Sequence, residues 1–177
     1  MSYTRMAQAR RRARELAVQL LYSLGNRSDQ SADVALELFC GEGGVAESDP
    51  PEVKEYLRFL ARGAWTRRSE SDDVLLRVIT GWRPERIVSV DRAVLRLAVF
   101  EGFLERSVPF AVAISEAVDI AQTFGTEDSG RFVNGVLARV VRRLIPESER
   151  NKKSAGKKRG EGEDHGSSEA GTLPTDR

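Results

Sequence analysis

The chain has 177 residues, of which 40% are hydrophobic, so it is long enough for one domain with a real core. Its formal net charge is +1, so the total charge does not by itself indicate a nucleic-acid partner. A single cysteine, Cys40, and a single histidine, His165, exclude an intrachain disulfide and a metal site of the usual Cys/His type.

The first predicted helix covers about residues 9–24. Apolar residues recur there at steps of three and four, which is the period of one face of a helix. This stripe consists of Ala13, Leu16, Ala17, Leu20, Leu21 and Leu24. The pair Gly25–Asn26 is a typical helix end.

Four arginines occupy five consecutive positions near the start of this helix, namely Arg10, Arg11, Arg12 and Arg14. We expect them to fan around the side away from the apolar stripe. Guanidinium groups suit phosphate because their planar fork donates paired hydrogen bonds and remains charged. Positive charge at a helix N-terminus opposes the helix dipole, so helix stability does not explain the placement. The residues alone leave phosphate binding and a solvated helix face as open alternatives.

Two aromatic residues are candidates for stacking on an unpaired base. Tyr22 lies beside the apolar stripe of the first helix, and Phe132 lies in the first turn of the last one. For Tyr22 the simpler interpretation is a boundary tyrosine with its hydroxyl in water, and for Phe132 it is core packing.

The middle of the chain predicts four further helices. A short one over residues 32–39 precedes a loop rich in Gly and Pro, and Pro50–Pro51 then opens a longer one with an apolar face. Ser71, followed by two acids, is typical of an N-cap, and it predicts a helix that runs to about Ile79. Residues 90–104 are apolar over a wide arc, so we expect a central helix there.

The last two predicted helices have well-marked ends. Pro109 precedes a helix over residues 110–124, and Pro146 ends a final helix that starts at Asp128–Ser129. Gly135 interrupts this final helix, although a mid-helix glycine costs about 1 kcal/mol relative to alanine. We interpret it as the site of a close helix crossing, and the alternative is the close approach of a ligand's backbone.

The predicted fold is therefore an all-α, compact bundle of six to seven helices, because no convincing strand pairs occur. The helical domain spans residues 1–146, and residues 147–177 are predicted to form a disordered charged tail. The stretch 150–159 of this tail holds six basic residues and no acid, and the remainder is mostly acidic.

The sequence offers no catalytic residue, cofactor site or metal site. Four carboxylates in the second half have no spacing that suits acid/base catalysis and read as surface charges: Glu101, Glu105, Glu116 and Asp119. Motifs for nucleotides or activated nucleophiles are missing. No apolar run approaches the roughly 20 residues of a membrane span, and the basic N-terminus lacks the apolar region of a signal peptide. We expect a cytoplasmic protein.

Residues 10–22, RRRARELAVQLLY, resemble the opening signature of the NusB family of transcription antitermination proteins. The second half agrees more fully: VDRAVLRLAVFE (90–101), VP (108–109), AISEAVDIA (113–121), FG (124–125) and DSGRFVNGVL (128–137) match in order and spacing. The resemblance covers about residues 5–145 and is weakest over 25–85. Ser115 and Ala138 depart from the residues usual in the family, Asn and Asp, which weakens any role for these two positions.

This resemblance implies an all-α fold of two packed halves and a function without enzymatic activity. It implies binding of the single-stranded boxA element of ribosomal RNA leader transcripts, jointly with the ribosomal protein NusE and thus, indirectly, with the RNA polymerase elongation complex. The RNA-facing residues would be Arg10, Arg11, Arg12, Arg14, Tyr22 and Phe132. Asp91 and Asp128 fall where the family has acids at or near the RNA and partner surface.

Two alternatives remain. The same helical domain resembles the N-terminal part of certain ribosomal RNA cytosine methyltransferases, but the cofactor-binding domain which that activity needs is not found before the tail. A helical RNA-binding or structural homodimer without boxA specificity is the other alternative.

Overall fold

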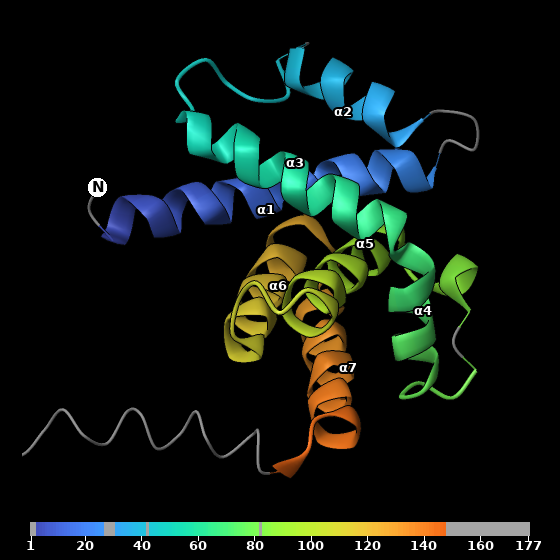
Figure 1. The fold of residues 1–177 in the computed structure, drawn as a ribbon. Coiled ribbons are helices and arrows are strands. Elements are labelled where there is room, and N and C mark those ends of the chain that lie inside the picture. The colour runs from blue at the N-terminus through green and yellow to red at the C-terminus, as the bar shows by residue number, and fades with distance from the viewer. Residues whose placement is uncertain (1–2, 27–30, 42, 82, 148–177) are drawn as a thin grey trace, which may run out of the picture. The chain divides into compact units, whose positions relative to one another are not determined.

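The computed structural model describes residues 3–26, 31–41, 43–81 and 83–147, and these residues contain seven α-helices and no strand (Figure 1). This confirms the expected all-α class. The helices are α1 (Tyr3–Gly25), α2 (Ala32–Gly41), α3 (Pro51–Thr66), α4 (Arg68–Leu76), α5 (Ser89–Ala98), α6 (Phe110–Phe124) and α7 (Ser129–Leu144). A 3-10 turn, η1 (Pro84–Arg86), precedes α5, and a π-helical segment, η2 (Val99–Leu104), continues it.

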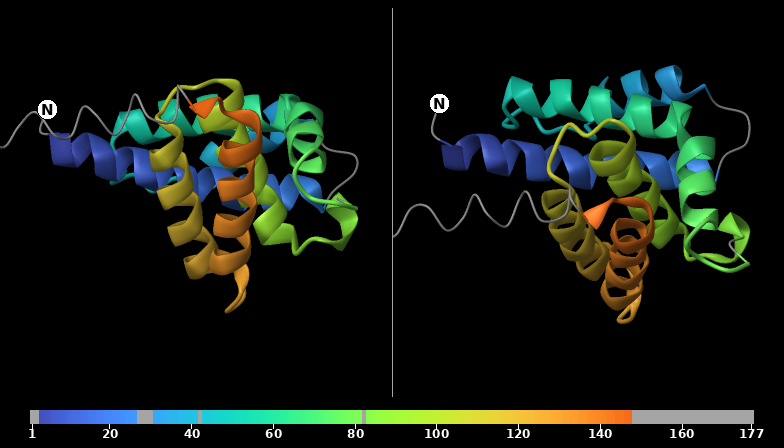
Figure 2. Two further views of the ribbon diagram at one scale, coloured as in Figure 1. Left: turned by 90° about the horizontal axis from the view of Figure 1, so that it is seen from below. Right: turned by 60° about the horizontal axis from the view of Figure 1, so that its bottom comes forward.

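Among the described residues, those up to Leu144 belong to the first of two units. In the first unit α1, α2 and α3 pack together, α5, α6 and α7 pack together, and α1 against α5 joins the two halves (Figures 1 and 2). Most of the predicted tail lies outside the described residues. Over the described part of the chain, no helix combines the length and the apolar character needed to cross a membrane.

The core forms where the apolar stripes predicted from the sequence meet. All six stripe residues of α1 are buried, as is the predicted face of α3. The two halves come into close contact at Gly63 in α3, where an added Cβ would lie only 2.1 Å from Cζ of Phe100 in η2. Glycine is therefore required at this position, because any side chain would displace a buried aromatic ring.

The predicted start of α4 is wrong. Ser71 is not an N-cap, because α4 already begins at Arg68, and a single residue separates it from the end of α3 at Thr66. Ser71 is buried inside the helix, and its hydroxyl donates a 3.5 Å hydrogen bond to the carbonyl of Arg96. The helix also ends at Leu76 rather than near Ile79. No Pro or Gly separates α3 from α4, so only a single residue, Arg67, interrupts the helical backbone.

The predicted central helix over residues 90–104 is present, but its second part is not a regular α-helix. From Val99 the helix widens into the π-helical η2, and the backbone N–H of Glu105 donates to the carbonyl of Phe100 at 2.8 Å. Such segments are rare and occur often at functional sites. Here η2 carries Glu101, which is buried.

The interpretation of Gly135 as a helix-crossing position is also wrong. Gly135 is exposed on α7, and an added Cβ would meet nothing within 4 Å among the described residues. No helix among the described residues therefore comes close enough to require a glycine at this position.

Candidate nucleic-acid interface

The arginine-rich start of α1 is anchored by one buried ion pair. Arg14 is only 4% exposed and Glu101 only 1%. The Arg14 guanidinium binds this carboxylate in a bidentate manner, through two hydrogen bonds. Nε donates to Oε2 at 2.9 Å, and Nη2 donates to Oε1 at 2.8 Å. Such two-pronged pairs fix orientation as well as contributing energy.

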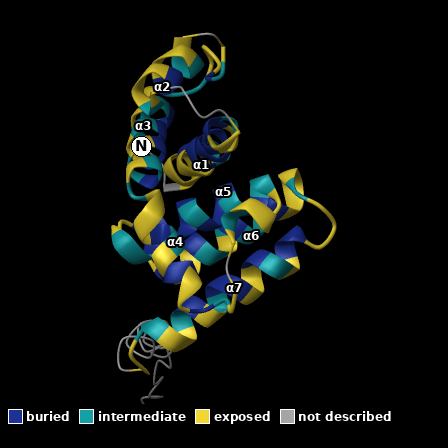
Figure 3. Ribbon diagram, turned by 90° about the vertical axis from the view of Figure 1, so that its right-hand side faces the viewer, coloured by how far each residue is buried: buried dark blue, intermediate teal, exposed yellow. Residues whose placement is uncertain are grey.

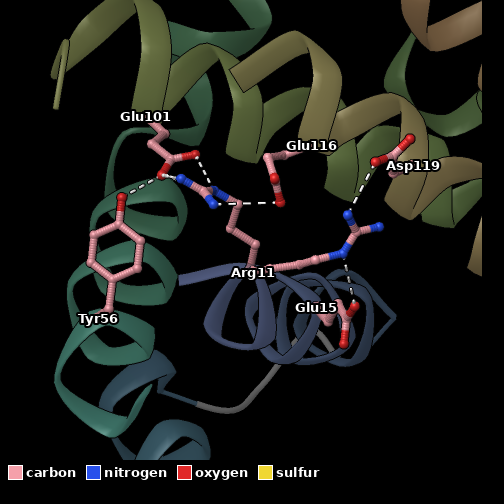
Figure 4. A network of polar contacts seen from close by, with 7 residues as sticks. Arg11, Glu15, Tyr56, Glu101, Glu116 and Asp119 are labelled. Atoms are coloured by element: carbon pink, nitrogen blue, oxygen red, sulfur yellow. Dashed lines mark hydrogen bonds and ion pairs between the residues drawn. The ribbon is translucent and has the colours of Figure 1, made fainter. Parts of the chain in front are cut away.

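Two further side chains complete this network, and Figure 4 shows how they converge from different helices. The Tyr56 hydroxyl of α3 donates a short hydrogen bond to Glu101, and Glu116 of α6 lies 3.5 Å from Nη1 of Arg14. Burial, together with the hydrogen bond to Glu101, raises the pKa of Tyr56 to about 12. Burial lowers the pKa of Arg14, but its acidic partners outweigh that effect and hold the pKa above its ordinary value.

The network therefore connects four elements, α1, α3, η2 and α6, through ion pairs and hydrogen bonds. A buried ion pair gains little net stability over apolar packing, but removing one partner leaves an uncompensated buried charge. The α1 helix can rotate about its axis only by breaking the contacts of Arg14 with η2 and α6. The directions in which Arg10, Arg11 and Arg12 project are thereby fixed.

Arg11 and Arg12 lie at the surface and make long or solvent-accessible ion pairs. Nη1 of Arg11 is 3.1 Å from Asp119 on α6, and Nε of Arg12 is 3.5 Å from Asp49 (Figure 4 shows Arg11). Both also lie 3.7 Å from Glu15 on their own helix. Exposed pairs of this kind contribute about 0–1 kcal/mol, so a phosphate can replace them at small cost.

Arg10 is exposed and has no acidic partner among the described residues. Its guanidinium instead lies 5.3 Å from the centre of the Tyr56 ring. It borders a shallow groove between α1 and α3, whose walls include Met6, Tyr56 and Phe59. A cation over an aromatic face remains free to bind an anion through its other donors.

The expectation that Arg14 faces RNA together with its neighbours does not fit this structure, because its guanidinium is buried and paired with Glu101 and Glu116. The sequence did hold a signal for this. Arg14 precedes Ala17 and Leu21 by three and seven residues, so it belongs to the apolar stripe rather than to the outer face. The interpretation of Glu101 as a surface charge was wrong for a related reason, since it stands in an otherwise apolar segment and pairs with a residue 87 positions away.

The two aromatic candidates differ in exposure. Tyr22 is 44% exposed on α1, so its ring is accessible, whereas Phe132 is half-buried in the first turn of α7. The exposed ring of Tyr22 is accessible for stacking, which stays a prediction. Phe132 offers one part of its ring to solvent and the rest to the protein.

The two acidic candidates differ in burial. Asp128 is exposed at the start of α7, 3.8 Å from Arg131, but Asp91 is only 4% exposed. Burial raises the pKa of Asp91, and a hydrogen bond from Ser129 offsets part of that rise. Asp91 is therefore not an open surface acid.

An all-helical domain that presents an exposed arginine face in a fixed direction has the features of a nucleic-acid-binding protein. Residues 11–142 match the model of the NusB family. The transcription antitermination protein NusB of Symbiobacterium thermophilum is 44% identical over 137 residues, which cover 76% of this chain and 90% of the relative. The NusB protein of Yersinia pestis strain Pestoides F is 45% identical over 133 residues, 75% of this chain and 92% of the relative.

Solved structures agree with these matches. T. maritima NusB superposes with a TM-score of 0.67 and 35% identity, covering 79% of this chain and 95% of that one. A crystal structure of the antitermination factors NusB and NusE in complex with dsRNA gives a TM-score of 0.64 and 26% identity, covering 76% and 97%. The chain belongs to the NusB family. Its function is that of a transcription antitermination factor, an RNA-binding protein without enzymatic activity.

Proposed function

We propose that this chain binds a single-stranded, boxA-like element of ribosomal RNA leader transcripts together with NusE, in the bacterial cytoplasm. It would act on the RNA polymerase elongation complex indirectly, through that assembly. The similar crystal structure in which NusB and NusE are bound to dsRNA supports both partners. The observation that carries the proposal is the exposed face of Arg10, Arg11 and Arg12, held in one direction by the buried pair of Arg14 with Glu101.

Affinity and selectivity would come from different side chains. The three outer arginines would contact phosphates, which gives affinity with little dependence on sequence. Tyr22 and Phe132 would stack on unpaired bases and supply the preference for boxA. Arg14 would be a positioning residue, and Asp128 would lie at the edge shared with the partner protein.

The direct test measures binding of the full chain to a boxA RNA and to a scrambled RNA, with and without NusE, at several salt concentrations. We expect Arg11→Ala with Arg12→Ala to weaken binding to both RNAs. The salt dependence should become shallower by about 1.4 in the log–log slope, because each phosphate contact on a single strand contributes about 0.7. An unchanged slope would contradict the assignment.

A matched control removes two arginines elsewhere. Arg58 and Arg62 lie on α3 and pair with Glu37 and Asp33 of α2 at 3.2 and 2.7 Å. Arg58→Ala with Arg62→Ala removes the same charge and should leave the slope unchanged. If both double variants weaken binding equally, total charge rather than the α1 face determines affinity.

A homodimer through the groove beside Arg10 is the second candidate function. The exposed Met6 and Phe59 on its walls favour it, because they are 45% and 38% exposed. Mass measurement in solution with and without boxA RNA distinguishes the two. A dimer that persists with RNA bound would mean that the α1 face is not the RNA surface.

A further inference from the structure

Gly135 is placed where folding gives no reason for a glycine. It lies in the middle of α7 without a positive φ, on the exposed side of the helix, and an added Cβ would meet nothing within 4 Å among the described residues. Alanine at this position would favour the helix. Packing among the described residues therefore does not explain the glycine.

Three arginines surround this glycine on the same face. Arg131, Arg139 and Arg142 stand four residues before, four after and seven after Gly135, and all three are exposed. Figure 3 shows that α7 has an exposed side opposite its buried one. The helix contains no acid, and no ion pair of Arg139 or Arg142 is formed within the described residues. Arg131 lies 3.8 Å from Asp128, one turn before it on the chain.

Helix stability explains only part of this pattern. Arg142 and Arg143 stand in the last turn, where positive charge complements the helix dipole, and Arg143 donates a hydrogen bond to the carbonyl of Arg77 at 3.4 Å. Arg139 is outside that turn, and Arg131 stands near the N-terminus, where the dipole disfavours it. A row of arginines around a bare backbone fits an extended polyanion that comes close to the helix.

We propose that the outer face of α7 is a track for the sugar-phosphate backbone of single-stranded RNA, which passes over Gly135 and places phosphates on Arg139 and Arg142. This inference rests on the proposed function and extends it, since the track continues the strand whose base stacks on Phe132. From Phe132 the helix rises roughly 10 Å to Arg139 and roughly 15 Å to Arg142. The track adds affinity for nucleotides that flank boxA, without base selectivity.

The first test separates stability from binding. Gly135→Ala should raise the melting temperature by roughly 2–4 °C, because alanine favours the helix and the space is open. The same variant should bind a boxA RNA with flanking nucleotides several-fold more weakly, and Gly135→Gln should bind more weakly still. Asn134→Ala, at the exposed neighbouring position away from this face, is the control and should bind normally. Unchanged affinity in both Gly135 variants would overturn the proposal.

The second test concerns the arginines. Arg139→Ala with Arg142→Ala should make the log–log salt slope shallower by about 1.4 on the flanked RNA, since two phosphate contacts are lost. The ratio of boxA to scrambled affinity should not change. On an RNA trimmed to boxA alone, the variant and the parent should bind equally. A slope that is unchanged on the flanked RNA would refute the track, whereas a parent chain that binds no boxA RNA would refute the proposed function instead.

Discussion

At the scale of single residues, the charged side chains divide into those that hold the fold and those left free for a partner. Arg14 and Arg11 are three positions apart in sequence, yet one is buried against Glu101 and the other is paired at the surface with Asp119. The sequence predicted the arginine cluster correctly but not this division. Arg14 and Glu101 are 87 positions apart, so their pairing leaves no local pattern in the sequence. Only the position of Arg14 within the apolar stripe could have indicated that its side chain is buried.

The buried pair predicts a large and specific loss of stability. Glu101→Gln leaves the Arg14 charge buried without its main partner, which should reduce the free energy of unfolding by about 3–5 kcal/mol. Tyr56→Phe removes only one neutral donor and should cost about 1 kcal/mol. Urea unfolding of both variants measures this difference. Equal losses would mean that the ion pair does not hold α1 in place.

The Tyr56 hydroxyl should titrate at a higher pH than an ordinary tyrosine. Because the neutral hydroxyl is buried and donates to Glu101, its pKa is raised from the ordinary value of 10.0 to about 12. Between these two values the unfolded chain releases this proton while the folded chain keeps it, so stability should fall as pH rises through this interval. Ultraviolet titration of the parent minus Tyr56→Phe isolates this residue. A midpoint near 10 would show that the hydroxyl is not buried in solution.

At the scale of elements, helix ends were predictable where backbone chemistry marks them. The bounds of α6, 110–124, agree with prediction because Pro109 and Gly125 enclose it. The start of α4 was not predictable, because residues 66–70 contain neither residue type and Ser71 resembles a cap by composition alone. The π-helical widening at η2 was also missed, since it depends on packing that brings Glu101 to Arg14.

Asp91, in the first turn of α5, should make the stability of the folded protein depend on pH. Burial raises the pKa of Asp91 in the folded protein, so the folded state favours the protonated acid. Stability should therefore rise as pH falls from neutral through the folded pKa toward the unfolded value. Asp91→Asn mimics the protonated form, so it should be more stable than the parent at pH 7 and lose that advantage near pH 4. Thermal unfolding at both pH values measures this; a less stable variant at pH 7 would show that attraction to the α5 N-terminus outweighs burial.

At the scale of the whole molecule, a net charge of +1 conceals a strongly uneven distribution. The basic residues of functional interest lie in three separate stretches: the start of α1, the outer face of α7, and residues 150–159, which hold six basic residues and no acid. Composition alone could not predict an RNA-binding protein, because acids elsewhere cancel these charges. Counts of charged residues over short stretches of the chain reveal these basic segments, which the net charge does not show.

The third basic stretch gives the last prediction. A chain ending at Glu147 loses all six of its cations, and if they contact RNA phosphates nonspecifically, binding to boxA and to scrambled RNA should weaken by the same factor. The salt dependence should become shallower for both RNAs, because fewer counterions are released. A control chain in which residues 160–177 alone are removed keeps these cations and should bind like the parent or more tightly, since the charged residues it loses are mostly acidic. Equal binding by the parent and the chain ending at Glu147 would assign RNA affinity to the helical unit alone.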